Sequence, residues 1–438
     1  MALKIIYTLS IISVGENQNM ERKISNDLLK WKRDSLNKPF FLYGPRCVGK
    51  TYSVLEFGKK FYSNIAYFNT EENDELYEII DKEKNLDKLA SKLALYCGES
   101  IFKDDTLIVF DNVNEARFMK VLKIFGNNNN PYHVVIISSN KIELNKQRIE
   151  EFYYRGMYNM DFFEYLENSD KIQLIDFIKD SFENDTVMPF HQMAIDAYYE
   201  YLITGGFPEV VYAMMNGASD LEIESIKRKI FDIYCSEYAK YDLEKCHDIF
   251  NVLPKCLTKD NKKFQYGTIK KGSRSKDYED SIEYLVGNSL VTRSYRLNDI
   301  VSPIMSMKDL DSFKLYFNDV GLLYTSLFLN KVKLLTSTDI RRCLIENDVA
   351  NTLVKEGYSL YYYQSDGKAE INFVIQTRNG KIIPIEVVNM KLTKAKAMSM
   401  FLTKFNLSDC IRITEDNFSR KKGVKFIPIY ATCCLKDL

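Results

Sequence analysis

The chain has 438 residues, 46% of them apolar, and its 60 lysines and arginines balance its 60 aspartates and glutamates. This length exceeds one ordinary hydrophobic core and predicts two to four domains, while the apolar content excludes general disorder. The balanced charge neither favours nor excludes a nucleic-acid partner, so only a local basic patch would indicate one.

The nine cysteines include no C-x-x-C pair, and the three histidines stand far apart. This pattern predicts neither a zinc site nor a disulfide framework, and it fits reduced thiols in the cytoplasm. No apolar run approaches the roughly 20 residues that span a bilayer, so we expect no membrane segment. The short apolar stretch 5–14 resembles a signal sequence but lacks a small-residue cleavage site. We expect residues 1–19 to be an extension without a role in the fold, with Met20 as the alternative start.

Residues 20–160 alternate short apolar runs with helical patterns, which predicts an α/β domain with a parallel sheet. We expect strands at 39–43, 65–69, 106–110 and 134–137, and helices at 51–62 and 73–96.

The segment that follows the first of these strands matches the P-loop pattern G-x-x-x-x-G-K-[ST] and opens a helix. Its glycines allow backbone amides to face a phosphate, and the helix N-terminus adds a favourable dipole. The lysine reaches the β- and γ-phosphates of ATP. We therefore expect ATP to be bound by Gly44, Pro45, Arg46, Cys47, Val48, Gly49, Lys50, Thr51 and Tyr52.

An acid ends the apolar strand at 106–110, as in a Walker B motif. We expect Asp111 and the Thr51 hydroxyl to hold Mg²⁺. A glutamate that activates water often follows this acid, but here the next residue is Asn112, which cannot take a proton at neutral pH. Glu115 is a possible substitute, and a solvated residue in the first turn of a helix is the alternative. ATP binding is therefore better supported than ATP turnover.

Further polar residues are candidates for sensing the γ-phosphate. Asn140 follows the fourth strand, where Ser138 and Ser139 compete for the same role. Arg148 and Arg155 are candidates in cis or from a neighbouring subunit, and a structural salt bridge is the alternative for each. The predicted catalytic set is Lys50, Asp111, Asn140 and Arg155.

Residues 161–335 read as a mainly helical region with a winged helix, in which 290–297 forms a hairpin. Basic residues interleave with Phe264, Tyr266 and Tyr278, which favours phosphate neutralisation and base stacking as strongly as it favours a solvated loop. The basic cluster comprises Lys262, Lys263, Lys270, Lys271, Arg274 and Lys276.

Residues 336–438 read as a C-terminal α/β domain. A helix containing Ile345 and Glu346 precedes strands at 360–364, 371–376 and 382–388. A second helix, with Met398 and Phe401, precedes strands at 410–414 and 426–430. The tyrosines at 361–363 are expected to pack within a strand.

Four segments together resemble a large prokaryotic group of AAA-like P-loop ATPases. Members of that group carry a C-terminal domain of uncharacterised function related to PD-(D/E)XK nucleases. The similar segments are Phe41 to Thr51, Thr-Gly-Gly-Phe-Pro-Glu at 204–209, Lys-Leu-Tyr-Phe-Asn-Asp-Val-Gly-Leu at 314–322, and 361–386. The resemblance covers residues 20 to about 430. It implies an AAA-like domain, a middle region and a restriction-endonuclease-like C-terminal domain.

The chain departs from the family pattern at several positions. Asp111-Asn112 replaces the usual Asp-Glu, and Tyr-Arg-Gly-Met at 154–157 replaces L-x-G-R, so that Arg155 lacks its partner arginine. The resemblance places the nuclease-like acids at Glu346, position 372 and Glu386, with a lysine at 388. Position 372 is Asn372 and position 388 is Val388.

These departures predict a degenerate nuclease-like domain used for binding or assembly, because cleavage needs the lost acid and lysine. Glu370 and Lys391 are substitutes only if they leave solvent. We expect an ATP-binding ATPase that couples nucleotide binding and slow hydrolysis to rearrangement of its C-terminal domains. The alternatives are an ATP-switched DNA- or protein-binding module without turnover, and an ATP-gated nuclease. Assembly into an oligomer is compatible with the sequence but is not indicated by it.

Overall fold

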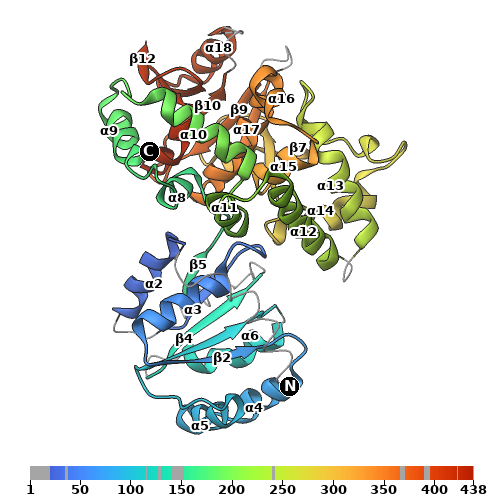
Figure 1. The fold of residues 1–438 in the computed structure, drawn as a ribbon. Coiled ribbons are helices and arrows are strands. Elements are labelled where there is room, and N and C mark those ends of the chain that lie inside the picture. Colours follow the sequence, from blue (N-terminus) through green and yellow to red (C-terminus); the bar gives the residue numbers. More distant parts are fainter. Residues whose placement is uncertain are drawn as a thin grey trace. The chain divides into compact units, whose positions relative to one another are not determined.

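The computed structural model describes residues 20–34, 38–114, 116–126, 130–139, 152–238, 242–365, 370–388, 395–421 and 423–437. The chain forms two compact units, Met1–Tyr158 and Asn159–Leu438. Figure 1 colours them from blue to teal and from green to red.

The first unit is built on a five-stranded sheet in the order β2-β3-β4-β1-β5 (Figure 1). All neighbouring strands are parallel, so the predicted parallel α/β domain is confirmed. The four predicted strands are present, and β5 is an additional edge strand that pairs with β1. The strands are β1 Phe40–Tyr43, β2 Asn64–Asn69, β3 Thr106–Asp111, β4 His133–Ser138 and β5 Tyr153–Gly156.

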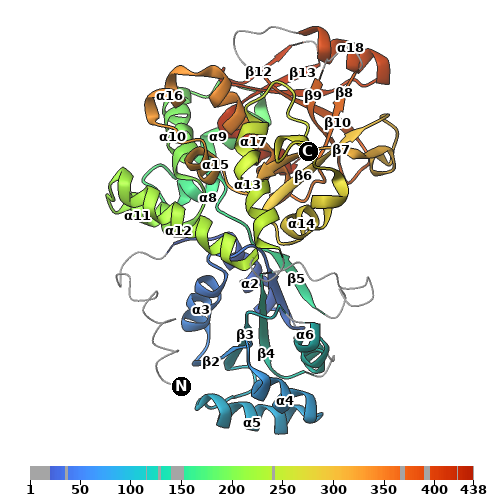
Figure 2. The same ribbon diagram turned by 90° about the vertical axis from the view of Figure 1, so that its right-hand side faces the viewer.

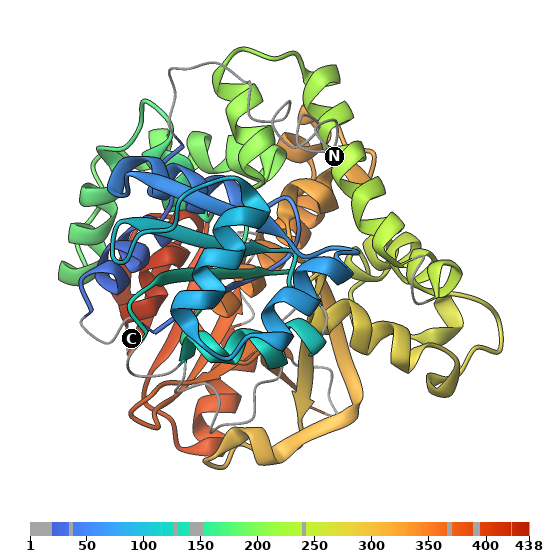
Figure 3. The same ribbon diagram turned by 90° about the horizontal axis from the view of Figure 1, so that it is seen from below.

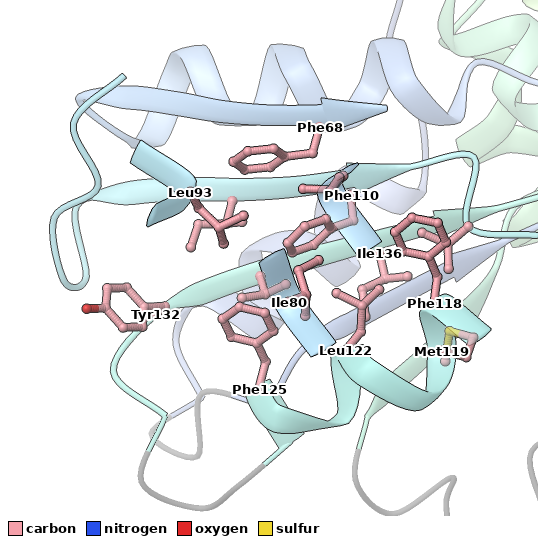
Figure 4. Packing of buried hydrophobic residues seen from close by; sticks show 14 of the residues in the cluster. Phe68, Ile80, Leu93, Phe110, Phe118, Met119, Leu122, Phe125, Tyr132 and Ile136 are labelled. Atoms are coloured by element: carbon pink, nitrogen blue, oxygen red, sulfur yellow. The ribbon is translucent and has the colours of Figure 1, made fainter. Parts of the chain in front are cut away.

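Helices cover both faces of this sheet. Figure 4 shows the core on one face, where Phe68, Phe110 and Ile136 of the strands meet apolar side chains of α4, α5 and α6. On the other face α3 packs against β2 and β4, and α2 packs against α3. The predicted helix at 73–96 is two helices, because Asn85 caps the backbone amide of Lys88 and starts a new one. The helices are α2 Ile24–Lys32, α3 Lys50–Phe61, α4 Asp74–Lys82, α5 Leu86–Cys97, α6 Ala116–Leu122 and the 3₁₀ turn η1 Lys123–Gly126.

The second unit combines a helical region with a mixed sheet. Figure 3 shows α13 and α14 (yellow-green to yellow) beside the strands β6 and β7 (light orange); α13 contacts β7 and α14 contacts β6, and α12 packs against α13. In the part of the chain that the structure describes, no helix of either unit is long and apolar enough to cross a bilayer. The α-helices are α8 Phe162–Glu167, α9 Leu174–Asn184, α10 His191–Thr204, α11 Pro208–Met215, α12 Asp220–Tyr238, α13 Leu243–Leu257, α14 Ser275–Gly287, α15 Val320–Ser326, α16 Lys331–Thr336, α17 Thr338–Lys355 and α18 Ala395–Phe405. The 3₁₀ turns are η2 Tyr266–Thr268, η3 Ile304–Met307 and η4 Ile429–Asp437.

The sheet of the second unit has eight strands in the order β12-β13-β11-β10-β9-β8-β6-β7 (Figure 2). The long helix α17 packs against β6, β7 and β10, and α18 contacts β9. The five strands predicted after residue 336 are present within a few residues, and Tyr361 to Tyr363 are buried strand residues, as expected. The strands are β6 Val291–Leu297, β7 Lys308–Phe317, β8 Tyr361–Gln364, β9 Glu370–Gln376, β10 Ile382–Val387, β11 Cys410–Thr414, β12 Ser419–Lys421 and β13 Val424–Pro428.

The segment 290–297 is not a hairpin. It forms the single strand β6, whose antiparallel partner is β7, because the run contains no turn residue and the chain reverses only between Leu297 and Lys308. On its other side β6 pairs in parallel with β8. The eight-stranded sheet therefore contains strands from both sides of the domain boundary predicted at residue 336. The predicted winged helix stays a prediction.

Two of the segments that carry the family resemblance meet inside the second unit. The buried carboxylate of Asp319 accepts hydrogen bonds from the Gly206 amide (2.8 Å) and the Leu322 amide (3.0 Å). A Cβ at Gly205 would lie 2.3 Å from Asp319 Oδ1, and one at Gly321 would lie 2.5 Å from the Thr204 carbonyl oxygen. The two glycine-containing segments therefore pack backbone to backbone, which a larger side chain would prevent.

Replacing Gly206 by alanine tests this packing. A Cβ there would lie 2.1 Å from the Met160 carbonyl oxygen, and backbone atoms cannot move aside as a flexible side chain can. We expect Gly206→Ala to lower the free energy of unfolding of the second unit by about 1–3 kcal/mol, measured by chemical denaturation. Gly287→Ala is the matched control, since a Cβ there meets nothing within 4 Å. Equal stability of the two variants would contradict the packing argument.

Candidate functional site

The phosphate loop joins β1 to α3 in the first unit. Gly49 precedes the helix with a φ of 88°, and Cys47 also adopts a left-handed conformation, with a φ of 62°. A Cβ at Gly44 would lie 1.9 Å from the Met157 carbonyl oxygen. The glycine before α3 has no side chain to cap the first-turn amides, so this helix end suits an anion.

Lys50 is the first residue of α3, and its side chain is buried. Its ammonium group donates hydrogen bonds to the carbonyl oxygens of Gly44 (2.8 Å) and Pro45 (2.7 Å). It therefore lies over the loop that the sequence predicted to hold phosphates. Phosphate oxygens are stronger partners for an ammonium group than neutral carbonyls are, because both partners then carry a charge.

Asp111 ends β3 and is nearly fully buried. Its Oδ2 accepts hydrogen bonds from the Thr51 hydroxyl (2.7 Å) and from the Tyr67 hydroxyl (2.8 Å). Burial and the Asp111 carboxylate raise the pKa of Tyr67, which keeps that phenol protonated as a donor. The structure thus brings together the two predicted magnesium ligands, and their hard oxygen donors fit Mg²⁺. Tyr67 was not predicted. It lies on β2, which pairs with β3, two residues before the strand ends, and this position is the sequence feature that could have indicated a contact with Asp111.

Asparagines and serines lie at or just beyond the carboxyl ends of β2, β3 and β4. Asn112 has a left-handed φ of 61°, and its side-chain amide donates to Asn69 Oδ1 (3.1 Å). The side-chain oxygen of Asn114 accepts from the hydroxyls of Ser138 (3.1 Å) and Ser139 (2.9 Å). The two serines considered as γ-phosphate sensors are therefore engaged by Asn114, which the sequence reasoning missed along with Asn69.

The other predicted sensors have different outcomes. Asn140, Arg148 and Glu115 lie outside the described residues. Arg155 lies on β5, where its Nε is 3.5 Å from Asp27 Oδ1 and its guanidinium lies over the Tyr153 ring. These contacts correspond to the structural alternative for Arg155, and its role as a sensor stays a prediction.

Arg22 is a buried residue that the sequence reasoning did not select. Its guanidinium donates to the carbonyl oxygen of Val48 in the phosphate loop and to that of Tyr158 (2.7 Å). The Met157 amide donates to the Tyr43 carbonyl oxygen (2.8 Å). The last residues of the first unit are thus fastened to both ends of the phosphate loop.

The nuclease-like positions of the second unit surround Glu346 on α17. This carboxylate is fully buried and accepts hydrogen bonds from Lys262 (2.5 Å), Tyr316 (2.8 Å) and Asn372 (2.9 Å). The ammonium of Lys314 lies 3.5 Å from it. Burial alone would raise the pKa of Glu346, but the two ammonium groups hold that pKa well below its usual range.

The neighbouring groups are also paired. Glu370 contacts Lys314 at 2.5 Å, and Glu386 contacts Arg412 at 2.8 Å. Asn372 uses its amide nitrogen on Glu346 and its oxygen on the Val387 amide (2.9 Å). In the described part of the chain, no group of three or more His, Cys, Asp or Glu side chains could hold a metal. The residues present do not fit the metal site of a nuclease, since cations already neutralise both surviving acids.

The basic cluster predicted to face nucleic acid is divided by the fold. Lys262 is buried against Glu346, and the Lys263 ammonium donates to the Ser312 hydroxyl (2.6 Å). Phe264 is buried and stacks on Phe313. The first part of the interleaved segment is therefore core rather than a binding surface. Lys270, Lys271 and Arg274 lie beyond it, between η2 and α14, and Lys276 is in the first turn of α14.

Three family models match successive parts of the chain. Residues 36–166 match an AAA domain, residues 195–333 a domain of unknown function (DUF8612), and residues 343–432 a second domain of unknown function (DUF4143). The parallel sheet, the phosphate loop and the first match define residues 36–166 as an AAA-like P-loop ATPase domain, a class that binds ATP.

Solved structures with similar parts are distant in sequence. They include a Walker-type ATPase of Pyrococcus abyssi, which is 11% identical with a TM-score of 0.43, over 70% of this chain and 96% of that one. A signal transduction ATPase with a tetratricopeptide repeat sensor from Pyrococcus horikoshii is 13% identical with a TM-score of 0.30, over 79% and 46%. Domain III of the replication initiation protein DnaA from Thermotoga maritima is 14% identical with a TM-score of 0.26, over 47% and 91%. No curated protein sequence matches the chain significantly.

Proposed function

We propose that the chain is an AAA-like ATPase that binds ATP with Mg²⁺, hydrolyses it slowly and uses the nucleotide state to rearrange its second unit. The observation that carries this proposal is the meeting of Thr51 and Asp111 at 2.7 Å beside the loop that Lys50 covers. In a P-loop ATPase these are the groups that hold the magnesium ion and the β- and γ-phosphates.

The chemistry assigned to each group follows from its charge. Lys50 neutralises charge that develops on the phosphates during transfer, and the first-turn amides of α3 orient them. Thr51 and Asp111 would hold Mg²⁺, which would neutralise part of the charge of the triphosphate. Asn112 stands where a water-activating glutamate is common, and an amide accepts no proton at neutral pH. This substitution supports slow turnover.

The coupling of the two units is proposed to run through the covalent segment 157–160. On its first side, Gly44 packs against the Met157 carbonyl and Arg22 holds Tyr158. On its second side, the Met160 amide donates to the Gly206 carbonyl oxygen (2.7 Å). A shift of the phosphate loop on ATP binding would therefore pull on residues that are anchored in the second unit.

Equilibrium binding tests the first part of the proposal, and hydrogen exchange tests the second. Calorimetric titration with ATP should show binding that weakens when Mg²⁺ is chelated. Amide exchange should then slow in the phosphate loop and change in the segments around Met160 and Gly206. No affinity for ATP or GTP with Mg²⁺ would overturn the proposal. If ATP binds but amide exchange changes only in the first unit, the proposed coupling to the second unit would be wrong and ATP binding would stand.

An ATP-switched binding module for DNA or protein is the second candidate, and Asn112 is the feature that favours it. The two candidates differ in turnover. If the wild-type protein releases phosphate no faster than Lys50→Ala, the ATP-switched binding module is the remaining candidate. An ATP-gated nuclease is disfavoured by the lysines that neutralise Glu346. Relaxation of supercoiled plasmid with Mg²⁺ or Mn²⁺, dependent on ATP and lost in Glu346→Gln, would reverse that judgement.

A further inference from the structure

We propose that Glu71 is the general base for ATP hydrolysis in this chain. Until ATP binds, its carboxylate forms an ion pair with Arg46 of the phosphate loop. The inference rests on the proposed ATPase function, and it names the group that takes the proton from the attacking water. It addresses the absence of an acid at position 112, where the sequence has Asn112.

The backbone around Glu71 is fixed to the end of the Walker B strand. β2 and β3 are in register with Asn69 opposite Asp111. Both the amide (2.9 Å) and the hydroxyl (3.0 Å) of Thr70 donate to the Asp111 carbonyl oxygen. The Glu71 amide donates to Asn69 Oδ1 (3.1 Å), the same oxygen that accepts from Asn112. Glu71 therefore occupies the carboxyl edge of the sheet, one strand over from the magnesium ligands.

An ion pair joins Glu71 to the phosphate loop itself. Arg46 Nη2 lies 3.7 Å from Glu71 Oε1, and the two side chains are 29% and 39% exposed. Partial exposure matters, because a general base must meet a water molecule that enters from solvent. Since Arg46 belongs to the phosphate loop, this ion pair places the Glu71 carboxylate beside the side chain of a loop residue.

Backbone strain gathers around the same edge. Cys47 in the phosphate loop, Glu72 beside Glu71, and Asn112 beside Asp111 all have left-handed φ values, between 52° and 62°. Non-glycine residues rarely adopt this conformation, and such strain concentrates at functional sites. Of the other acidic candidates, Asp111 already accepts from Thr51 and Tyr67, and Asp74 is paired with Arg117 of α6, which does not belong to the phosphate loop.

The proposed step begins with the binding of ATP at the phosphate loop. ATP draws the Arg46 guanidinium to a γ-phosphate oxygen, where a charge-assisted pair forms, and the Glu71 carboxylate is released. The carboxylate accepts a proton from water as the water oxygen bonds to the γ-phosphorus. The bond from that phosphorus to the β–γ bridging oxygen breaks, and its electron pair stays on ADP. Glu71 then returns its proton to solvent.

Replacing Glu71 by glutamine is the direct test. We expect phosphate release at saturating ATP to fall at least 100-fold, since general-base catalysis contributes on the order of 10²–10⁴. The dissociation constant for ATP should stay within about threefold of the wild-type value, because glutamine is nearly isosteric. After acid quenching of a long incubation, the bound nucleotide should be ATP in Glu71→Gln and ADP in the wild type. Glu75→Gln, which changes an exposed acid of α4, is the matched control and should turn over at the wild-type rate.

A second pair of variants separates a base from a residue that acts only by positioning Arg46. If Glu71 only holds Arg46, adding Glu71→Gln to Arg46→Ala will change nothing further. If Glu71 is the base, the double variant will be at least tenfold slower than Arg46→Ala alone. Turnover of Glu71→Gln within threefold of wild type would overturn the proposal. Wild-type protein that binds ATP but releases no more phosphate than Lys50→Ala would also overturn it and leave ATP binding standing. A wild type without nucleotide affinity would overturn both.

Discussion

Lys50→Ala is expected to weaken ATP binding by at least about 100-fold and to reduce phosphate release to background. The ammonium is buried over the phosphate loop, where it is held by the carbonyl oxygens of Gly44 and Pro45. Losing a buried, hydrogen-bonded charge from such a contact costs about 2–5 kcal/mol of binding free energy. Titration calorimetry and a phosphate-release assay at matched protein concentrations measure the two effects.

The control for this variant is Lys60→Ala, which removes an exposed lysine from the same helix. It should leave both ATP affinity and phosphate release unchanged. Circular dichroism of Lys50→Ala should match that of the wild type, because the hydrogen bonds from the ammonium to Gly44 and Pro45 lie in a loop and not within a helix or strand. Undiminished ATP affinity in a folded Lys50→Ala protein would mean that nucleotide binds elsewhere, and the site described above would be wrong.

The second large effect is expected from Lys262→Met, which leaves the buried Glu346 carboxylate without its nearest cation. The ammonium lies 2.5 Å from Glu346 Oε2, and both side chains are almost fully buried. Removing one partner of a buried ion pair typically costs 3–5 kcal/mol, because the remaining charge is desolvated and uncompensated. We expect about this loss in the free energy of unfolding of the second unit, measured by chemical denaturation at pH 7.

Two comparisons make the test specific. Lys263→Met removes the neighbouring lysine, which donates only to a serine hydroxyl, and should cost less than about 1 kcal/mol. The double variant Lys262→Met with Glu346→Gln removes both charges and should recover more than half of the loss. Additive losses in the double variant would contradict the proposed pairing.

The pH dependence of this pair has a definite sign. The folded-state pKa of Glu346 is lowered, so its stabilising contribution is present above the unfolded value near 4.5 and is lost as the pH falls below it. In Lys262→Met the main attraction is gone, and burial then raises the carboxyl pKa relative to the wild type. The variant should therefore lose less stability than the wild type on acidification, and the two unfolding curves should converge toward low pH.

Most strands and helices were predictable because each rests on a local pattern. The runs that became β3 and β4 are apolar over at least four residues, and a sequence window of that length decides them. The edge strand β5 (Tyr153–Gly156) is half exposed and only four residues long, so it carries no such pattern. The hairpin expected at 290–297 was wrong because an alternating run does not say where its partner strand lies.

The geometry of the phosphate loop was largely predictable, and the surroundings of Glu346 were not. The phosphate loop is contiguous, so the residues that shape it are adjacent in the sequence. Glu346 was selected as a metal ligand of a nuclease-like site, but its partners Lys262 and Lys314 lie 84 and 32 residues away. Nothing in the sequence near either lysine indicates a buried carboxylate, so Lys262 was placed in a basic cluster.

The sequence by itself determined the phosphate-binding turn, the acid that ends its neighbouring strand and the alternation of strands with helices in the first unit. Each depends on residues within a few positions of one another, where sterics and periodicity leave little choice. Only the tertiary structure decided that Tyr67 supports Asp111, that Arg46 meets Glu71 and that lysines enclose Glu346. Those pairings join residues from separate strands and helices, and packing of the whole unit selects among the many partners that charge alone would allow.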